Sequence, residues 1–185
     1  MTADAFKVTI HMVSSLDGFI AKKDGTVSWL ETSDHYGNGV KLTEDDMDNF
    51  IKSIDCYVMG ARTYEHALAL GWPYGDVTVM VLTHRNLLPE RESAEFHSGD
   101  LDKFVNQRLK PNYRNVWLVG GSMLAKDFIR CNLVDDIRLM IAPIILGDGT
   151  LFFDYIGREL PLHLKDVTAY ESGFVELWYE IRKSP

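Results

Sequence analysis

Apolar and polar residues alternate at the start of the chain. Residues 6–13 (FKVTIHMV) follow this period of two, which predicts a strand, and residues 14–18 have the composition of a turn. Short apolar or β-branched runs at 55–59, 77–82 and 116–119 predict three further strands. The chain therefore begins with β structure and returns to it repeatedly.

Between these runs, apolar residues recur with the period of an α-helix. Thr43 precedes three acidic residues and can cap a helix, because the positive end of the helix dipole favours acids. Further helices are predicted at about 63–70, in a segment that Pro111 ends, and directly after Gly121. The residues expected on their apolar faces are Met47, Phe50, Ile51 and Ile54 in the first helix, Leu101, Phe104, Val105 and Leu109 in the third, and Leu124, Phe128 and Cys131 in the fourth.

The last third of the chain is rich in strands. Residues 137–141 alternate, and residues 162–171 and 174–182 form a predicted hairpin about Ser172-Gly173. This order predicts an α/β fold with a mostly parallel central sheet, helices on both faces and an antiparallel hairpin at the C-terminal edge. No linker, repeat or low-complexity tract divides residues 1–185, so we expect one domain.

Composition narrows the range of partners. The 185 residues carry 19 Lys and Arg against 27 Asp and Glu, a net charge of −8, with no basic run, so we expect no nucleic-acid partner. The two cysteines are isolated, and neither a disulfide framework nor a metal site is expected. No signal peptide or membrane-spanning segment is recognisable, which predicts a cytoplasmic protein with a small-molecule substrate.

Candidate chemistry lies at the ends of three predicted strands. Gly120-Gly121 stands between a strand and a helix, where the backbone can approach a phosphate and the helix N-terminus favours an anion. Gly60-Ala61-Arg62-Thr63 and Thr83-His84-Arg85 follow two other strands and add hydroxyl groups and cations. Together they favour a phosphorylated dinucleotide, although the glycine pair alone could equally serve close packing of strand and helix.

Four blocks of sequence resemble the ordered signatures of the dihydrofolate reductase-like superfamily. They are Ser15-Leu16-Asp17-Gly18-Phe19-Ile20-Ala21 with Trp29, Met59-Gly60-Ala61-Arg62-Thr63-Tyr64-Glu65, Val119-Gly120-Gly121-Ser122, and Ile141-Ala142-Pro143-Ile144-Ile145-Leu146-Gly147-Asp148-Gly149. The last block is especially similar to the C-terminal reductase domain of the bifunctional deaminase-reductase of riboflavin biosynthesis. The resemblance implies a three-layer αβα fold and a reductase that uses NADPH.

The resemblance also implies positions for the cofactor. At Ala61 this chain lacks the basic residue common in dihydrofolate reductases, and Arg62 can take over its role at the 2′-phosphate. The implied cofactor-binding residues are Gly60, Arg62 and Thr63 at the phosphates, Leu82, Thr83 and His84 around the adenosine, Gly120, Gly121, Ser122, Met123 and Leu124 along the pyrophosphate, and Val13, Ile20 and Ala21 at the nicotinamide.

The substrate side offers two candidate catalytic carboxylates. Asp34 stands about as far beyond Trp29 as the acid of dihydrofolate reductases does, although Glu31 competes for that role and either residue could instead cap a loop. Asp17 lies where riboflavin-type reductases approach their substrate, but an Asp-Gly turn is an equally good explanation. Ser15, Asp17 and Trp29 are therefore the candidate substrate-binding residues.

These features together predict an NADPH-dependent oxidoreductase that transfers a hydride to a small heterocyclic acceptor, similar to 5-amino-6-(5-phosphoribosylamino)uracil reductase. The zinc-deaminase motif that often accompanies that reductase is absent, so another acceptor is possible. Dihydrofolate reduction is the alternative reaction, and a non-catalytic nucleotide-binding module is the alternative of another class. A homodimer is also expected, because Phe152, Phe153 and Phe174 lie in the strand-rich C-terminal part.

Overall fold

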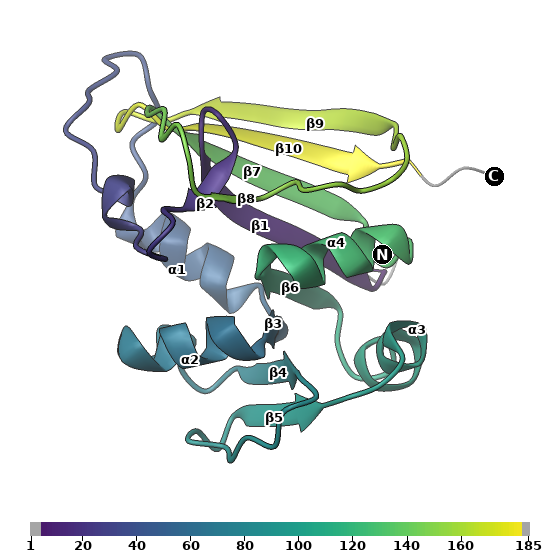
Figure 1. Ribbon diagram of the computed structural model, residues 1–185. Helices are drawn as coiled ribbons and strands as arrows, with labels where there is room; N and C mark the ends of the chain where they lie inside the picture. The colour runs from purple at the N-terminus through teal and green to yellow at the C-terminus, as the bar shows by residue number, and fades with distance from the viewer. Residues whose placement is uncertain (1–4, 183–185) are drawn as a thin grey trace.

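The computed structural model describes residues 5–182, which form a twisted eight-stranded sheet in the order β5-β4-β3-β6-β1-β7-β10-β9 (Figure 1). The strands from β5 to β7 in this order run parallel, whereas β10 is antiparallel to both of its neighbours. This arrangement confirms the predicted sheet with its C-terminal hairpin. The bounds are β1 (Lys7–Ser15), β3 (Cys56–Gly60), β4 (Thr78–Leu82), β5 (Ala94–His97), β6 (Asn115–Gly120), β7 (Asp136–Ala142), β9 (Leu162–Ala169) and β10 (Val175–Ile181).

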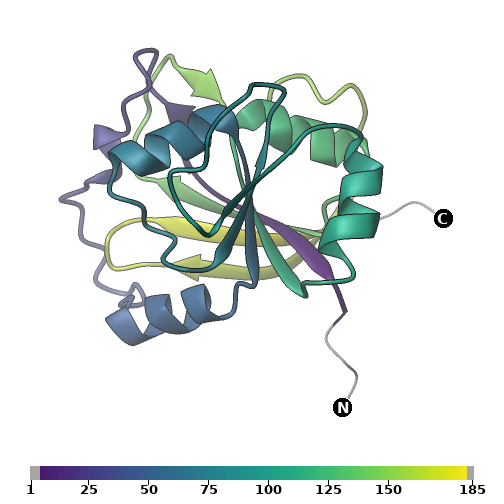
Figure 2. The same cartoon turned by 90° about the horizontal axis from the view of Figure 1, so that it is seen from below.

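Helices cover both faces of the sheet. Figure 2 shows α1 and α2 on one side of the central strands and α3 and α4 on the other. The helices are α1 (Glu44–Lys52), α2 (Ala61–Ala69), α3 (Leu101–Phe104), which continues into the π-helical η2 (Val105–Leu109), and α4 (Ser122–Arg130). Two short strands, β2 (Phe19–Ala21) and β8 (Thr150–Leu151), pair beside the main sheet, and the 3-10 helix η1 (Ser28–Leu30) follows β2.

Strand alternation divides the core between the two faces. Val58, Leu118 and Phe128 belong to the cluster beneath α4, whereas Tyr57 and Tyr64 belong to the cluster beneath α2. Because successive residues of a strand point to opposite faces, Tyr57 and Val58 feed the two clusters from one strand. The sheet is thus buried on both sides over β3 and β6, with α2 against one face and α4 against the other.

Helix α1 is capped as predicted but lies differently from expectation. Thr43 accepts a hydrogen bond from the Asp46 N–H, and the Asp46 carboxylate accepts one from the Thr43 N–H, which completes a capping box. No residue of α1 is buried, and Met47 is 43% exposed. The predicted apolar face is therefore confirmed in part, because α1 rests on the sheet through Phe50, whose ring packs against His11 and Trp117, whereas Met47 lies largely outside this contact.

Three further expectations need correction. Cys131 is exposed, because α4 ends at Arg130 and Cys131 is its C-cap. Strand β5 was not predicted, since its short AEFH sequence lies at a polar edge of the sheet. Phe152 and Phe174 are buried within the subunit and cannot offer a dimer surface, whereas Phe153 is 43% exposed. An interface between two copies of the chain stays a prediction.

Over residues 5–182, no helix reaches the length and hydrophobicity needed to span a membrane.

Candidate functional site

Two helices begin side by side at the carboxyl ends of neighbouring strands. β3 leads into α2 at Gly60, and β6 leads into α4 at Gly121, where the Gly120–Gly121 peptide bond is cis. β3 and β6 pair in parallel, with Met59 opposite Gly120. The two helix N-termini therefore share the edge of the sheet at which open α/β sheets bind ligands.

These two helices lack the caps that the other helices carry. The Thr43 side chain caps α1, and Asp100 caps α3 by accepting a hydrogen bond of 2.8 Å from the Lys103 N–H. Neither α2 nor α4 has a side-chain cap or an acidic residue in its first turn. Their first N–H groups thus keep no side-chain partner, and the partial positive charge of both helix ends is uncompensated. Such ends suit a phosphate.

The glycines leave open space in front of these helix ends. A Cβ placed on Gly60 would meet no atom within 4 Å, and one placed on Gly121 would meet only the Thr63 Oγ1, at 3.8 Å. Gly120 differs, because its φ of +105° favours glycine and a Cβ there would lie 3.1 Å from the Met12 Cε. The backbone conformation therefore accounts for glycine at 120. At 60 and 121 the missing side chains leave a cradle that a phosphate can enter.

A third strand end lies beside the first two, because β4 pairs with β3. The Thr83 Oγ1 accepts a hydrogen bond from the Arg85 N–H, and the Arg85 guanidinium binds both Glu65 oxygens, at 3.1 and 2.6 Å. Arg62 is exposed in the first turn of α2 and forms no hydrogen bond or ion pair with the rest of residues 5–182. Of the two arginines, Arg62 is thus the one free to meet an anion.

The Asp17 carboxylate fastens two loops together. It accepts hydrogen bonds from the Ser15 hydroxyl at 2.6 Å, the Leu146 N–H at 3.0 Å and the Gly147 N–H at 2.7 Å. These bonds, led by that of Ser15, lower the pKa of Asp17. The Ser15 hydroxyl also accepts from the Phe19 N–H and is buried. Both side chains therefore make hydrogen bonds within the β1–β2 turn, and those of Asp17 also hold this turn to the loop after β7.

Trp29 and Asp34 differ in burial. Trp29 is buried against Val13, Ala142 and Phe174, and its Nε1 has no hydrogen-bond partner within residues 5–182. Asp34 is exposed in the loop before α1, and a Cβ on Gly173 would collide with its carboxylate, so Asp34 faces the turn between β9 and β10. The structure thus gives neither candidate carboxylate a buried position beside Trp29.

The remaining candidate cofactor residues lie in β2, in the first turn of α4 and at the end of β4. Ile20 and Ala21 are half-buried in β2, which pairs with β8. Met123 is 69% exposed in the first turn of α4, and Ser122 and Leu124 beside it are half-buried. Leu82 is half-buried at the end of β4, and His84 is exposed after it.

Comparison with known protein families identifies the family of this chain. The family model of the RibD C-terminal domain matches residues 6–175. The chain belongs to this family. The uncharacterized protein YwjB of Bacillus subtilis (strain 168) is 29% identical over 175 residues, which cover 94% of this chain and 97% of YwjB.

Solved structures confirm the fold of this RibD C-terminal domain. A crystal structure of a Shewanella sp. PV-4 protein superposes with a TM-score of 0.83 at 22% identity, covering 96% of this chain and 100% of that chain. A dihydrofolate reductase from Enterococcus faecalis, complexed with NADP(H), superposes with a TM-score of 0.62 at 16% identity, covering 96% and 97% of the two chains. The fold is therefore the three-layer, dihydrofolate reductase-like reductase fold.

Sequence reasoning missed a buried cluster of charges in this RibD C-terminal domain. Glu176 is 4% exposed on β10, and the Arg138 guanidinium binds both of its oxygens, at 2.8 and 3.0 Å. The Tyr170 hydroxyl donates to Glu176 Oε2 at 2.9 Å, and His11 Nε2 lies 3.3 Å from Oε1. The available signal was the period of the strand, which places Glu176 on the same face as buried Phe174.

The contacts of Glu176 shift its ionisation and that of Tyr170. Burial by itself would raise the pKa of Glu176, but hydrogen bonds from His11 and Arg138, with the charge of Arg138, lower it to about 2. Burial, followed by the hydrogen bond to Glu176, raises the pKa of Tyr170 to about 12. At neutral pH, Glu176 is therefore an anion and Tyr170 a neutral donor.

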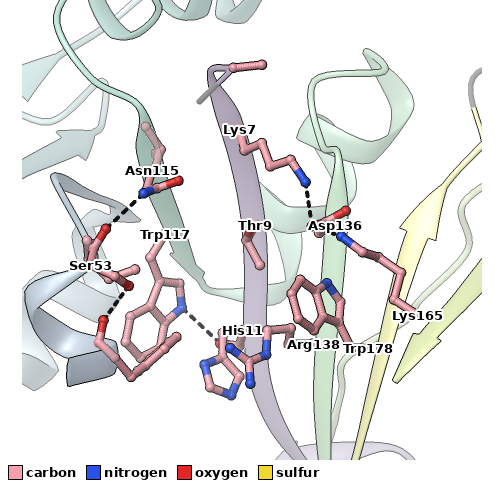
Figure 3. Close-up of a pocket in the computed structure, with 14 residues that line it drawn as sticks. Lys7, Thr9, His11, Ser53, Asn115, Trp117, Asp136, Arg138, Lys165 and Trp178 are labelled. Carbon is pink, nitrogen blue, oxygen red and sulfur yellow. Dashed lines mark hydrogen bonds and ion pairs between the residues drawn. The ribbon is translucent and has the colours of Figure 1, made fainter. Parts of the chain in front are cut away.

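A cavity of about 340 Å³ opens beside this cluster, on the face of the sheet that carries α1. Figure 3 shows that Lys7, Thr9 and His11 follow one another along β1 as its floor, with Trp117 and Trp178 on either side. At the far end, Lys7 and Lys165 each pair with Asp136, at 3.3 and 3.2 Å. The cavity thus runs from an ion-paired outer end to the His11 ring.

Proposed function

We propose that this protein is an NADPH-dependent reductase that transfers a hydride to a small heterocyclic acceptor. The observation that carries the proposal is the pair of uncapped helix N-termini that begin side by side at Gly60 and Gly121. Membership of the RibD C-terminal domain family and the reductase fold support the same conclusion.

In this proposal the pyrophosphate of NADPH binds in the cradle between α2 and α4. The N–H groups that follow Gly60 and Gly121 donate to its oxygens, and the Thr63 hydroxyl, which faces Gly121, adds a further donor. Arg62 has no competing ion pair and meets the 2′-phosphate. Thr83 and His84 then lie toward the adenosine, because β4 is the next strand on that side.

The other end of the bound cofactor extends toward β1 and β2. Val13, Ile20 and Ala21 would form an apolar wall for the nicotinamide, which supplies the hydride when it is bound. Asp17 fastens the β1–β2 turn to the loop at Leu146, so we assign it the task of holding this wall in place. The protein's contribution to the transfer is to position the acceptor and to exclude water.

The acceptor proposed is a heterocycle of the class of 5-amino-6-(5-phosphoribosylamino)uracil, whose opened sugar forms the C=N bond that is reduced. The direct test measures loss of absorbance at 340 nm with NADPH and either this pyrimidine or dihydrofolate. Reduction of the pyrimidine supports the proposal, and reduction of dihydrofolate alone supports dihydrofolate reductase activity. Tight NADPH binding with neither acceptor reduced would favour the non-catalytic module.

Arg62 offers a finer test of the cofactor site. Arg62→Ala should raise the Kd for NADPH at least tenfold more than the Kd for NADH, because only NADPH carries the 2′-phosphate. Titration with each nucleotide, followed by tryptophan fluorescence, measures both constants. Arg108→Ala is the matched control, since Arg108 is also exposed but pairs with Glu95 away from this edge. An equal loss for both nucleotides in Arg62→Ala would remove Arg62 from the 2′-phosphate.

A further inference from the structure

Reduction of a C=N or C=O bond requires a proton as well as a hydride, and neither candidate carboxylate is placed to give one. Asp17 accepts three hydrogen bonds inside its turn, and its lowered pKa keeps it ionised. Asp34 is exposed and turned toward Gly173. The proton source for the proposed reaction must therefore be sought elsewhere on the face of the sheet that carries α1.

His11 has the geometry of a proton donor held by a carboxylate. Its Nε2 lies 3.3 Å from Glu176 Oε1, and its Nδ1 is buried and has no hydrogen-bond partner within residues 5–182. The ring is fixed by Phe50 and Trp117, with ring centroids 5.0 and 5.1 Å away. It lies at the inner end of the cavity, on the β1 floor that Figure 3 shows. One ring nitrogen thus faces Glu176, and the other is buried without a partner among the described residues.

The position of His11 along β1 brings it next to the proposed nicotinamide wall. His11 and Val13 are two residues apart and therefore project from the same face of the strand, about 6.6 Å from one another at about 3.3 Å per residue. An acceptor at the inner end of the cavity would lie between them. The hydride would then reach it from the Val13 side, and a proton from the His11 side.

We propose that His11, oriented by Glu176, is the catalytic residue that protonates the acceptor, an inference that rests on the proposed reductase function. A bound reduced nicotinamide would supply the hydride with its electron pair to the acceptor carbon and would itself be oxidised. The π pair of the C=N bond moves onto nitrogen, which forms its N–H bond with the proton of the His11 imidazolium Nδ1. His11 keeps the Nε2 proton that bonds Glu176, and solvent restores the proton at Nδ1.

The groups that face this pair fit the assignment. β7 contributes Arg138, which binds both oxygens of Glu176, and the Tyr170 hydroxyl donates to Glu176 Oε2. α1 and β6 present only the Phe50 and Trp117 rings to the imidazole. Glu176 is therefore the one anion recorded against His11 among the described residues. Because its pKa is about 2, Glu176 is ionised at neutral pH.

The kinetic test compares His11→Gln with His66→Gln, an exposed histidine near the end of α2. With NADPH and either the pyrimidine or dihydrofolate as acceptor, His11→Gln should lower kcat about 100-fold and leave the KM for NADPH within twofold. Glu176→Gln should also lower kcat, because it removes the orienting charge, and Tyr170→Phe should have a smaller effect.

A second readout needs no turnover. Nitrogen-15 NMR of the free protein identifies the tautomer of the neutral His11 ring, and we expect the proton on Nε2, toward Glu176, with Nδ1 bare. A proton on Nδ1 of the neutral ring would contradict the orientation. If wild type reduces an acceptor and His11→Gln matches His66→Gln, the role of His11 fails alone. If wild type reduces neither acceptor, the reductase proposal fails and the role of His11 falls with it.

Discussion

Replacement of Glu176 by Gln probes the buried charge cluster quantitatively. Its contacts lower the pKa of Glu176 from 4.5 to about 2, which corresponds to about 3 kcal/mol of stability at neutral pH. Since the folded-state pKa is the lower one, this contribution is present above about pH 4.5 and is lost as pH falls toward 2. At pH 3, roughly 1.4 kcal/mol of it remains.

Urea unfolding at pH 7, 5 and 3 measures this dependence. The free energy of unfolding of wild type should exceed that of Glu176→Gln by about 3 kcal/mol at pH 7 and by less than half of that at pH 3. Glu180→Gln is the matched control, because Glu180 is exposed on the same strand, and its difference from wild type should stay small throughout. A Glu176→Gln difference that is equal at pH 7 and pH 3 would refute the assigned ionisation.

Three further predictions concern other parts of the fold. Cys131 is exposed and should react with a thiol reagent in the native protein, whereas Cys56, buried with its pKa raised to about 12 by burial, should react only on unfolding; equal rates would contradict this. Thr43→Ala should cost about 1 kcal/mol in urea unfolding by removing the α1 cap, and no measurable loss would show that α1 does not unfold with the sheet. Asp17→Asn should lower Tm at pH 7 and speed hydrogen exchange at the Gly147 amide, and unchanged exchange there would argue against the clamp.

Much of the fold was predictable because its signals are local. The cap at Thr43, the run at 116–119 before Gly120-Gly121 and the alternation of 174–182 each reflect neighbouring residues, and each element was found. The depth to which a helix is buried depends on distant parts of the chain rather than on neighbouring residues. α1 has a regular apolar face, of which Phe50 packs on the sheet, yet Met47 on the same face remains 43% exposed.

One part of the candidate site could likewise be predicted from the sequence, and another part could not. The cradle at Gly60 and Gly121 could be inferred because parallel strands bring their carboxyl ends to one edge. The cluster around Glu176 could not, since it joins β1, β7 and β10, and only the order of the strands brings His11 within 3.3 Å of Glu176. The sequence signal for it was the strand period, which places Glu176 on the same face as buried Phe174.

The most direct test of the cofactor site gives α2 the acidic cap that it lacks. Gly60 has φ −85° and ψ 166°, which other residues adopt, and its Cβ position is open, so Gly60→Asp should fold with an unchanged or slightly higher Tm. Calorimetric titration with NADPH should then show a Kd at least tenfold weaker than that of wild type, while Gly60→Ala, which adds no charge, should lose less. Equal NADPH affinity in wild type and Gly60→Asp would contradict a phosphate site at these helix ends.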